Sequence, residues 1–440
     1  MKDIRHLRCL GAVLLWCVGW GVAAEDGRAS DVWTLERCER EALVRSHEVG
    51  VAAYRLQQAE ASADEAEAVR RPTLSASGAY TYTSETMELG LPALGTFNLP
   101  TIRFGDGNVY DLGLVASVPL FTGGALRSRA QAERAASRAA RHDLAADSLQ
   151  VVHEVRTAYF RALGAKAQAD AARVAEDRLR RHVTDLEAAI EIGAAAEEAR
   201  IQALSRLRQG EQRRLQADLG ASVETLNLGR LVGRPGEEPD LLDNLRRPLF
   251  LHEPFVRGDS VDGRPELAAF DERIQQSERL AGAARGAYFP TLSAQLSYHH
   301  AKPGVDLIAD EWMQYAAAGI VLSWPIWDWG ARAQRVRGAR VAGRVLEEQR
   351  ALLHDALRNN LAVALSALAS AREQAAKVGE RAELERRRLE LVKGRYKNAA
   401  ATESERLDAE DDLAAAEMDL AAATAHVRLA EADVLYALGQ

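Results

Sequence analysis

The sequence contains two similar halves, and this duplication limits the folds that are open to the chain. RRPTLSASGAY at 70–80 is matched by AYFPTLSAQLSY at 287–298, and SVPLFTGGALRS at 117–128 is matched by SWPIWDWGARAQ at 323–334. From Pro119 onward the halves align at a constant offset of 206 residues, whereas upstream the offset is 218. The difference of 12 residues is a longer loop in the first half. The sequence therefore predicts two copies of one structural unit.

Three segments have the alternation of a β-strand, two in the first half and one in the second. Apolar residues occupy every second position of 72–82, 109–118 and 290–298, and the positions between them are mostly small or polar. A fourth segment, at about 314–324, is apolar on both faces. Alternation with a period of two predicts strands that lie between two different environments. Each half then reads as a helix, a strand, a loop, a second strand and a long helical hairpin.

The hairpins follow from long stretches without proline. Residues 124–193 contain no Pro and one internal Gly, Gly164, and would extend about 100 Å as a single helix at ~1.5 Å per residue. Between 151 and 169 apolar residues recur in steps of four and three, with Ala at most of the later positions. This is coiled-coil spacing with small seam residues, and both a two-stranded coiled coil and a ring of helix pairs fit it.

The repeat also sets the expected domain boundaries. The first repeat is expected at 25–233 and the second at 266–440, joined by a connector at 234–265 that holds five of the twelve prolines. The first repeat holds a strand pair at about 72–121 and a hairpin at 124–232, and the second holds a strand pair at about 290–326 and a hairpin at 330–439.

The first 24 residues have the pattern of a signal peptide. A basic start precedes a short apolar stretch that ends in Val22-Ala23-Ala24, a small-residue cleavage site. No later stretch is apolar and long enough for a transmembrane helix. The segment carries a net charge of +2, so cleavage changes the net charge from −8 to −10, which argues against nucleic-acid binding.

The strands can be read as water-soluble hairpins or as membrane strands. Ten residues suffice to cross a membrane when a strand is tilted, and aromatic residues gather at the strand ends as in an interfacial girdle. These aromatics are Phe121, Trp312, Trp324, Trp327 and Trp329. Four strands leave two bare edges, which lipid does not tolerate, and the smallest closed barrels have about eight strands. Several copies must therefore share a barrel, and three copies would supply twelve strands.

Residues suited to catalysis or metal binding are sparse. Gly123-Gly124 lacks the lysine of a phosphate-binding loop, and no His and Glu residues have zinc-ligand spacing. His299 and His300 are expected on opposite faces of a strand, so they would not share a metal ion. Cys38 is expected to be a small buried helix residue, since the other two cysteines lie in the signal peptide. We therefore expect neither enzymatic activity nor a cofactor.

The chain as a whole resembles the TolC-family outer-membrane efflux proteins. The segments that carry the resemblance are WTLERCEREALVRSHEV, RRPTLSASGAY, VPLFTGG, YFPTLSAQLSY, WPIWDWG, GRYKNAAATESERLDAEDDL and LYALG. The resemblance implies a fold that is mainly α with membrane β: long hairpins forming a periplasmic α-barrel, and four strands per protomer in a twelve-stranded trimeric β-barrel. It further implies a homotrimer in the outer membrane of a Gram-negative bacterium. This trimer would be the passive exit duct of a tripartite efflux or type I secretion system.

The resemblance also assigns partners and site residues. A periplasmic adaptor and an inner-membrane pump of the RND or ABC type would act with the duct. The adaptor would meet the hairpin tips, which are expected at 193–198 and 399–404 and include Gly193, Ala194, Ala195, Ala399, Ala400 and Ala401. Tyr396, Glu405 and Asp408 match the periplasmic aperture of the family. Six carboxylates around one axis would have raised pKa values.

Three alternatives stay open at this stage. The segment ESERLDAEDD could be a solvated acidic helix face rather than part of an aperture. The chain could be a periplasmic adaptor, although adaptors have one hairpin and this chain has two. It could also be a coiled-coil scaffold without a pore.

Overall fold

The computed structural model describes residues 32–85, 88–89, 102–103, 107–238, 240–245, 247–249, 261–306, 311–398 and 400–440. The expected signal peptide lies outside these residues, and so do much of the expected connector and Ala399 of the second tip.

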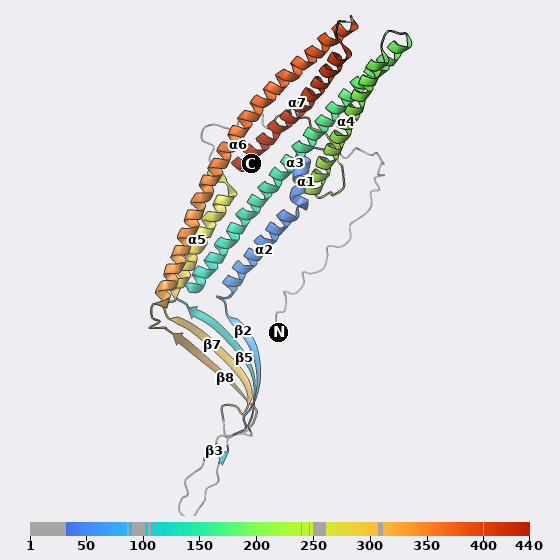
Figure 1. The fold of residues 1–440 in the computed structure, drawn as a ribbon. Helices are drawn as coiled ribbons and strands as arrows, with labels where there is room; N and C mark the ends of the chain where they lie inside the picture. Colours follow the sequence, from blue (N-terminus) through green and yellow to red (C-terminus); the bar gives the residue numbers. More distant parts are fainter. Residues whose placement is uncertain are drawn as a thin grey trace, which may run out of the picture.

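Two helices of 67 residues run the length of the helical part: α3 (Ala125–Glu191) and α6 (Ala331–Lys397). Two shorter helices, arranged end to end, pack alongside each of these long helices (Figure 1). These are α2 (His47–Ala68) and α4 (Glu197–Leu231) along α3, and α5 (Pro265–Gly286) and α7 (Glu403–Leu438) along α6. The second arm of each hairpin is therefore about half as long as the first, and a helix from before the strands completes the pair.

The helices form one curved layer with two open edges. Since α5 and α7 also contact α3, the order across the layer is α2 and α4, then α3, then α5 and α7, then α6. A short helix, α1 (Leu35–Arg45), packs against the middle of α3. None of the helices in the described part of the chain has both the length and the hydrophobicity of a membrane span.

Both long helices begin at a glycine that follows a strand. Gly124 precedes α3 with φ of 80° and Gly330 precedes α6 with φ of 83°, and these residues occupy matching positions in the two repeats. Left-handed backbone at these positions favours glycine, which explains why both halves keep it. Gly164 has a different reason, since a Cβ there would lie 2.6 Å from the Cβ of Ala425 on α7. The close approach of α3 to α7 thus requires the absence of a side chain.

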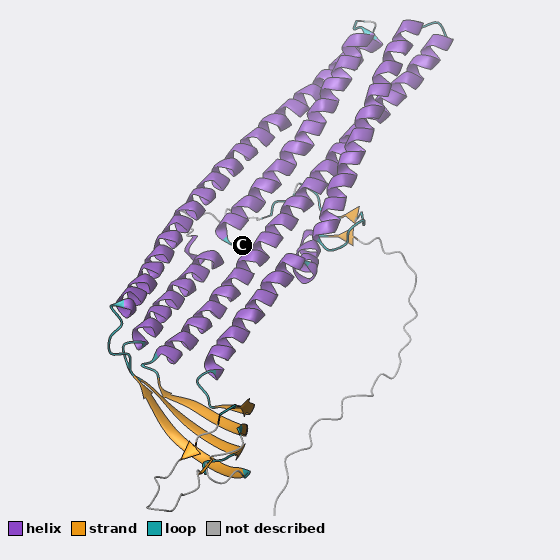
Figure 2. Ribbon diagram, turned by 60° about the horizontal axis from the view of Figure 1, so that its bottom comes forward, coloured by secondary structure: helices purple, strands orange, loops and turns teal. Residues whose placement is uncertain are grey.

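Four antiparallel strands form the main sheet, in the order β2 (Thr73–Tyr82), β5 (Asn108–Phe121), β7 (Thr291–Lys302) and β8 (Met313–Ser323). The four strands expected from the sequence are confirmed, including the fourth, which lacks clear alternation. Among the described residues, no strand pairs with the outer edge of β2 or of β8. The sheet continues directly from the helical layer, as Figure 2 shows.

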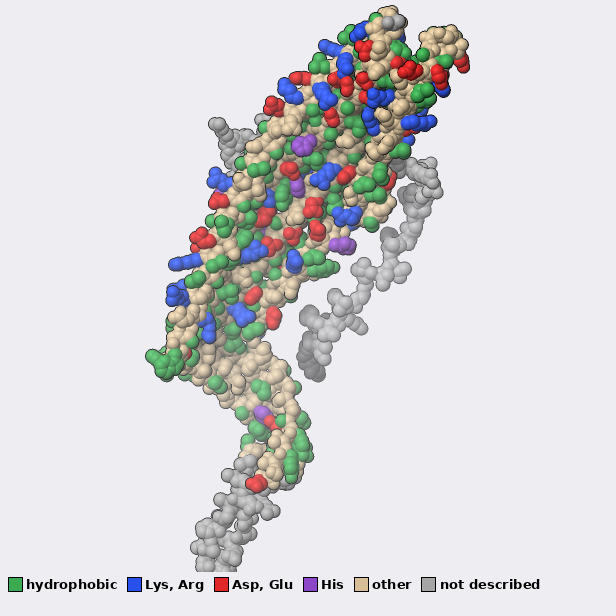
Figure 3. All heavy atoms as spheres, viewed as in Figure 1, with side chains coloured by type: hydrophobic (Ala, Val, Ile, Leu, Met, Phe, Trp, Pro, Cys, Tyr) green, Lys and Arg blue, Asp and Glu red, His purple; other side chains and the backbone are tan. Residues whose placement is uncertain are grey.

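The register brings residues of one kind to each face of the sheet. Ala76 is opposite Leu114, Leu114 is opposite Tyr298, and Tyr298 is opposite Ala316, so one face is apolar. Ser75 and Ser297 pair with Val115 on the other face. Figure 3 shows that charged side chains cover the helices densely and are few over the sheet.

Short pairings complete the described secondary structure. They are the parallel pair β1 (Val32–Trp33) and β6 (Asp240–Leu241), the antiparallel pair β3 (Glu88–Leu89) and β4 (Ile102–Arg103), and a 3-10 turn at Val261–Gly263.

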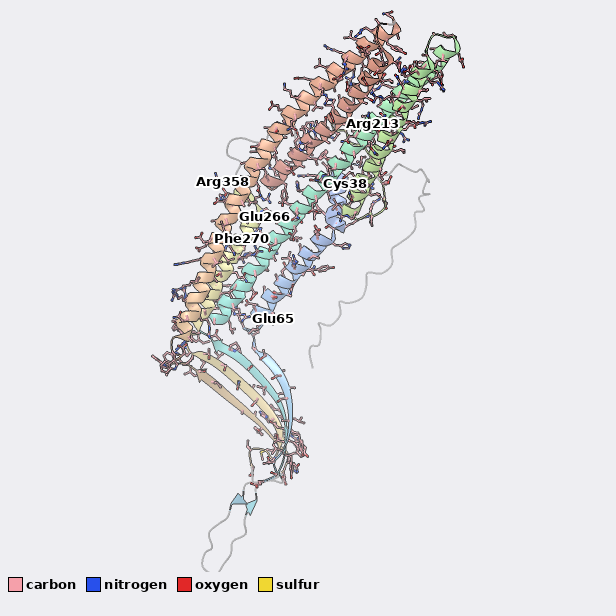
Figure 4. All side chains as sticks on the ribbon, in the orientation of Figure 1. Cys38, Glu65, Arg213, Glu266, Phe270 and Arg358 are labelled. Atoms are coloured by element: carbon pink, nitrogen blue, oxygen red, sulfur yellow. The ribbon has the colours of Figure 1, made fainter. Side chains whose placement is uncertain are left out.

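The largest buried cluster lies at the middle of α3. Trp33, Val155 and Tyr159 pack there with Cys38, which is fully buried, as expected from the sequence (Figure 4). Burial, and then the charge of Glu41, raises the pKa of Cys38 to about 12. The Tyr159 hydroxyl donates to Asp243 at 2.7 Å, so the described part of the connector is held at this level of the helices.

Candidate functional site

The two hairpin tips lie side by side at the end of the molecule farthest from the sheet (Figure 1). The first tip spans 192–196, between the end of α3 and the start of α4, and the second spans 398–402, between α6 and α7. Each tip therefore starts slightly earlier than the sequence predicts, and residues 197–198 and 403–404 are already helical. Gly193 has φ of 73°. Gly193, Ala194 and Ala400 are exposed, and Ala195 and Ala401 are partly buried.

Glu405 is part of a capping box at the start of α7. The Thr402 backbone N–H donates to Glu405 Oε2 at 2.7 Å, and the Glu405 N–H donates to Thr402 Oγ1 at 3.2 Å. The expected rise in pKa concerns six carboxylates around the axis of a trimer and stays a prediction; within one chain Glu405 has a different environment. The hydrogen bond from the Thr402 backbone, which outweighs the effect of burial, lowers the pKa of Glu405.

The capping box gives a first prediction. Thr402→Ala is expected to destabilise the first turn of α7 by about 1 kcal/mol, because the Glu405 backbone N–H loses its acceptor. Hydrogen exchange of the amides of 403–406 should become roughly fivefold faster, at about 1.4 kcal/mol per tenfold change. Thr402→Ser keeps the acceptor and should exchange as the wild type does. Equal exchange in the Ala and Ser variants would contradict the assignment.

Asp408 takes part in an ionic contact between the two hairpins. Arg206 of α4 donates to Asp408 at 3.0 Å and also lies 2.8 Å from Asp411, which in turn accepts from Arg213 at 3.1 Å. Figure 4 shows Arg213 on α4, near the middle of that helix. Glu405 and Asp408 are both exposed, but each already has a hydrogen-bonding partner within the chain.

Tyr396 lies in a cluster of polar side chains just below the second tip. Its ring centroid is 6.1 Å from that of His182, and the Arg406 guanidinium lies 5.1 Å from the centre of the ring. Burial, and then the nearby Glu403 carboxylate, raises the pKa of Tyr396 to about 12. The cluster thereby joins α6 to the start of α7.

His182 and Glu403 are site residues that the sequence interpretation missed. His182 Nε2 contacts Glu403 Oε1, and the His182 side chain is 1% exposed. Burial alone would raise the pKa of Glu403, but the hydrogen bond with His182 and the nearby Tyr396 hydroxyl outweigh burial and lower it. These two residues are 221 positions apart, so no local motif pairs them. The signal available in the sequence was a histidine, His182, that lies beside the heptad seam of α3.

The expected interfacial aromatics lie at the two ends of the sheet. Phe121 ends β5, while Trp324 and Trp327 follow β8 where the sheet meets the helices, and all three are exposed, Trp327 by 74%. Figure 3 shows the exposed hydrophobic group at this junction. Trp312 lies at the opposite end of the sheet and stacks on His300, with ring centroids 4.6 Å apart.

The histidines at 299 and 300 point to opposite faces of the sheet, as expected. His299 Nδ1 lies 2.9 Å from Asp111 Oδ1 on the polar face, whereas His300 lies with Trp312 on the apolar face. In the part of the chain that the structure describes, no group of three or more His, Cys, Asp or Glu side chains could hold a metal ion.

Comparison with solved structures identifies the fold. A crystal structure of CusC, solved in work on the folding and transmembrane channel formation of CusC, matches this chain with a TM-score of 0.76 at 20% identity. The match covers 92% of this chain and 91% of CusC. The CmeC outer membrane channel of Campylobacter jejuni has a TM-score of 0.75 at 19% identity, with 94% and 87% covered. The open state of the MtrE outer membrane channel of Neisseria gonorrhoeae has a TM-score of 0.75 at 21% identity, with 92% and 88% covered.

Sequence comparison agrees with the structural one. A search of curated proteins found no significant match. The profile of the family described as outer membrane efflux protein matches residues 39–234 and 257–440, which together make up most of the chain. The two matched segments correspond approximately to the two repeats. The chain therefore belongs to the outer membrane efflux protein family and is an outer-membrane protein whose helices extend into the periplasm.

Proposed function

We propose that three copies of this chain form an exit duct, with a twelve-stranded β-barrel in the outer membrane and an α-barrel in the periplasm. The observation that carries the proposal is that both layers of the protomer are open at the same two sides. The sheet has β2 and β8 as its edges, and the helical layer has α2 with α4 and α6 as its edges. Bare strand edges are not stable in lipid, so closure by further copies satisfies the sheet and the helices together.

The two faces of the sheet suit the inside and the outside of a shared barrel. One face carries Leu74, Leu112, Leu114, Leu296, Ile320 and Leu322, and the other carries Thr73, Ser75, Ser77, Ser117, Ser293 and Gln295. An apolar outer face would contact lipid, and the hydroxyl-bearing face would line a water-filled channel. The aromatics at the ends of the strands would lie at the two membrane surfaces.

The tips would form the periplasmic end of the duct. We propose that Tyr396, Glu405 and Asp408 surround the aperture and that the tip residues around Gly193 and Ala400 meet a periplasmic adaptor. Ala399, outside the described residues, belongs to the same proposed contact. An inner-membrane pump would supply the energy, and the duct itself would be passive and without catalytic activity. Opening would require the contacts of Arg206 and His182 with α7 to rearrange.

Conductance in planar bilayers tests this proposal. The full-length protein, expressed with its signal peptide and purified from the outer-membrane fraction, should run as a trimer on unheated SDS gels and as a monomer after boiling. It should give discrete conductance steps in a planar bilayer. Recovery from the soluble periplasmic fraction as a monomer without channel activity would contradict the proposal and favour a scaffold or an adaptor.

A further inference from the structure

We propose that neighbouring subunits are matched at the base of the α-barrel by opposite charges. Asp64 and Glu65 on α2 of one copy would meet Arg335 and Arg337, which lie on the two flanks of the free side of α6, in the next copy. The inference rests on the trimer proposed above, and it names the surface by which one copy of the chain receives another. It is argued from the orientation of the two edge helices, from their charges and from the heights of these residues above the sheet.

The first step concerns which side of α6 is free. A Cβ at Gly343 would lie 3.2 Å from Ser277 Oγ, and Arg350 donates to Asp271 at 2.6 Å, so these positions face α5. At about 100° per residue, the positions on the opposite side are Val341, Val345 and Leu352. These side chains are 49%, 50% and 70% exposed. An exposed apolar stripe at this spacing is a helix-packing face without a partner in the protomer.

The free side of α2 is defined in the same way. Ala52 and Ala63 are buried against α3, which places Tyr54, Ala61 and Glu65 on the opposite side of the helix. Tyr54 is 71% exposed. Both edges of the helical layer therefore present apolar residues to whatever completes the ring.

The second step concerns charge. Residues 331–344 at the start of α6 include five arginines and no acidic residue. Helix α2, by contrast, has five acidic residues and one arginine. Glu60, Glu67 and Arg332 already form ion pairs within the protomer. Asp64, Glu65, Arg335 and Arg337 are exposed and form no ion pair among the described residues.

The third step concerns height above the sheet. Rotation about the axis of a ring leaves height unchanged, so residues of adjacent copies meet only when they lie equally far from the sheet. Helix α2 ends at Ala68, four residues before β2, and α6 begins at Ala331, with seven residues between it and β8. Glu65 is three residues from the sheet end of α2, and Arg335 is four residues from the sheet end of α6. These counts correspond to about 5 and 6 Å along the helices. Figure 4 shows Glu65 at the sheet end of α2.

The same count matches the apolar residues of the two edges. Tyr54 lies 14 residues from the end of α2, and Val345 lies 14 residues from the start of α6, so both are about 21 Å along the helix from its end nearest the sheet. Charges thus meet opposite charges, and apolar side chains meet apolar side chains.

Charge reversal tests the match. Asp64→Arg/Glu65→Arg should lower the fraction of SDS-resistant trimer at least about tenfold at low salt, because each of the three seams then carries only positive charge. High salt should restore part of the SDS-resistant trimer, because it screens the repulsion between like charges. Adding Arg335→Glu/Arg337→Glu to the same chain should restore trimer at low salt. Glu278→Arg, on α5 and away from both edges, is the control and should leave the trimer intact.

A cysteine pair provides a second readout that does not depend on charge. In a Cys38→Ala background, Glu65→Cys/Arg337→Cys should give covalently linked trimers on oxidation, and neither single cysteine should do so. Cross-linking without rescue by the charge swap would still support the placement of the two helices. A trimer that forms normally with the acidic residues reversed, and that the cysteine pair does not cross-link, would overturn the inference and leave the proposed duct intact. A monomeric wild type would instead overturn the duct.

Arginines beside a membrane could also bind the headgroups of anionic lipids. In that case Arg335→Glu/Arg337→Glu would weaken the assembly alone, and the reversal of Asp64 and Glu65 would have no effect. That outcome would overturn the subunit match.

Discussion

Leu296→Arg is expected to prevent assembly in the outer membrane, whereas Gln295→Arg is expected to assemble. The two residues are adjacent near the middle of β7, and their side chains point to opposite faces of the sheet. Leu296 is flanked by Ala116 and Ala318 on the apolar face, and Gln295 by Ser117 and Gly319 on the other. An arginine that faces lipid near the bilayer midplane costs about 2–4 kcal/mol, and the proposed barrel would contain three of them.

The measurement is the amount of heat-modifiable trimer in the outer-membrane fraction, compared at equal expression. Leu296→Arg should leave less than about a tenth of the wild-type amount, at ~1.4 kcal/mol per tenfold change. Leu296→Met keeps an apolar side chain and should assemble normally. Assembly of Leu296→Arg together with failure of Gln295→Arg would mean that the faces of the sheet are assigned the wrong way round. Normal assembly of both variants would contradict the proposal that the strands lie in the membrane.

His182→Leu is expected to loosen the contact between α7 and the first hairpin. Glu403 would remain nearly buried without the partner that stabilises its charge, and breaking a buried pair in this way costs about 3–5 kcal/mol. Hydrogen exchange of the amides near 403–407 should become on the order of 100-fold faster. In the proposed duct, the variant should also spend more time in conducting states in a planar bilayer.

Two controls separate this effect from a general loss of packing. His182→Leu/Glu403→Leu removes both polar groups and should recover most of the protection. Tyr396→Phe removes only the hydroxyl near Glu403 and should cost at most about 1 kcal/mol, much less than His182→Leu. Wild-type exchange in His182→Leu would show that the contact does not hold α7.

The same contact has a defined pH dependence. The pKa of Glu403 is lowered in the folded chain, so its contribution to stability is complete above the ordinary carboxylate pKa of 4.5 and is lost as the pH falls through the lower folded value. The first turns of α7 should therefore exchange faster below about pH 4.5 in the wild type. In His182→Leu/Glu403→Leu this acid-dependent increase should be absent. An unchanged increase in that variant would assign it to other groups.

The elements of the fold could be predicted because their signals are local or repeated. The alternation in 72–82 and 290–298 and the proline-free stretch after Gly124 each reflect one segment and its surroundings, and the structure has β2, β7 and α3 there. The unequal arms of the hairpins follow from the expected tips at 193–198 and 399–404, but the partner of the lower half of α3 could not be predicted, because it is α2, which precedes the strands.

The candidate site was harder to predict, because its contacts join distant segments. Arg206 and Asp408 are 202 residues apart, and only the packing of α4 near α7 brings them together. The capping box is a different case. Thr402 followed by Glu405 is a local signature of a helix start, but the interpretation of the segment as an acidic ring or a solvated face passed over it.

The stoichiometry of the purified assembly tests the central claim most directly. Native mass spectrometry of the full-length protein, extracted from outer membranes in detergent, measures the number of chains in each particle. Shared closure of four-stranded sheets predicts a particle of three identical chains, with no stable monomer that conducts ions. A single chain that forms a complete pore would contradict the account.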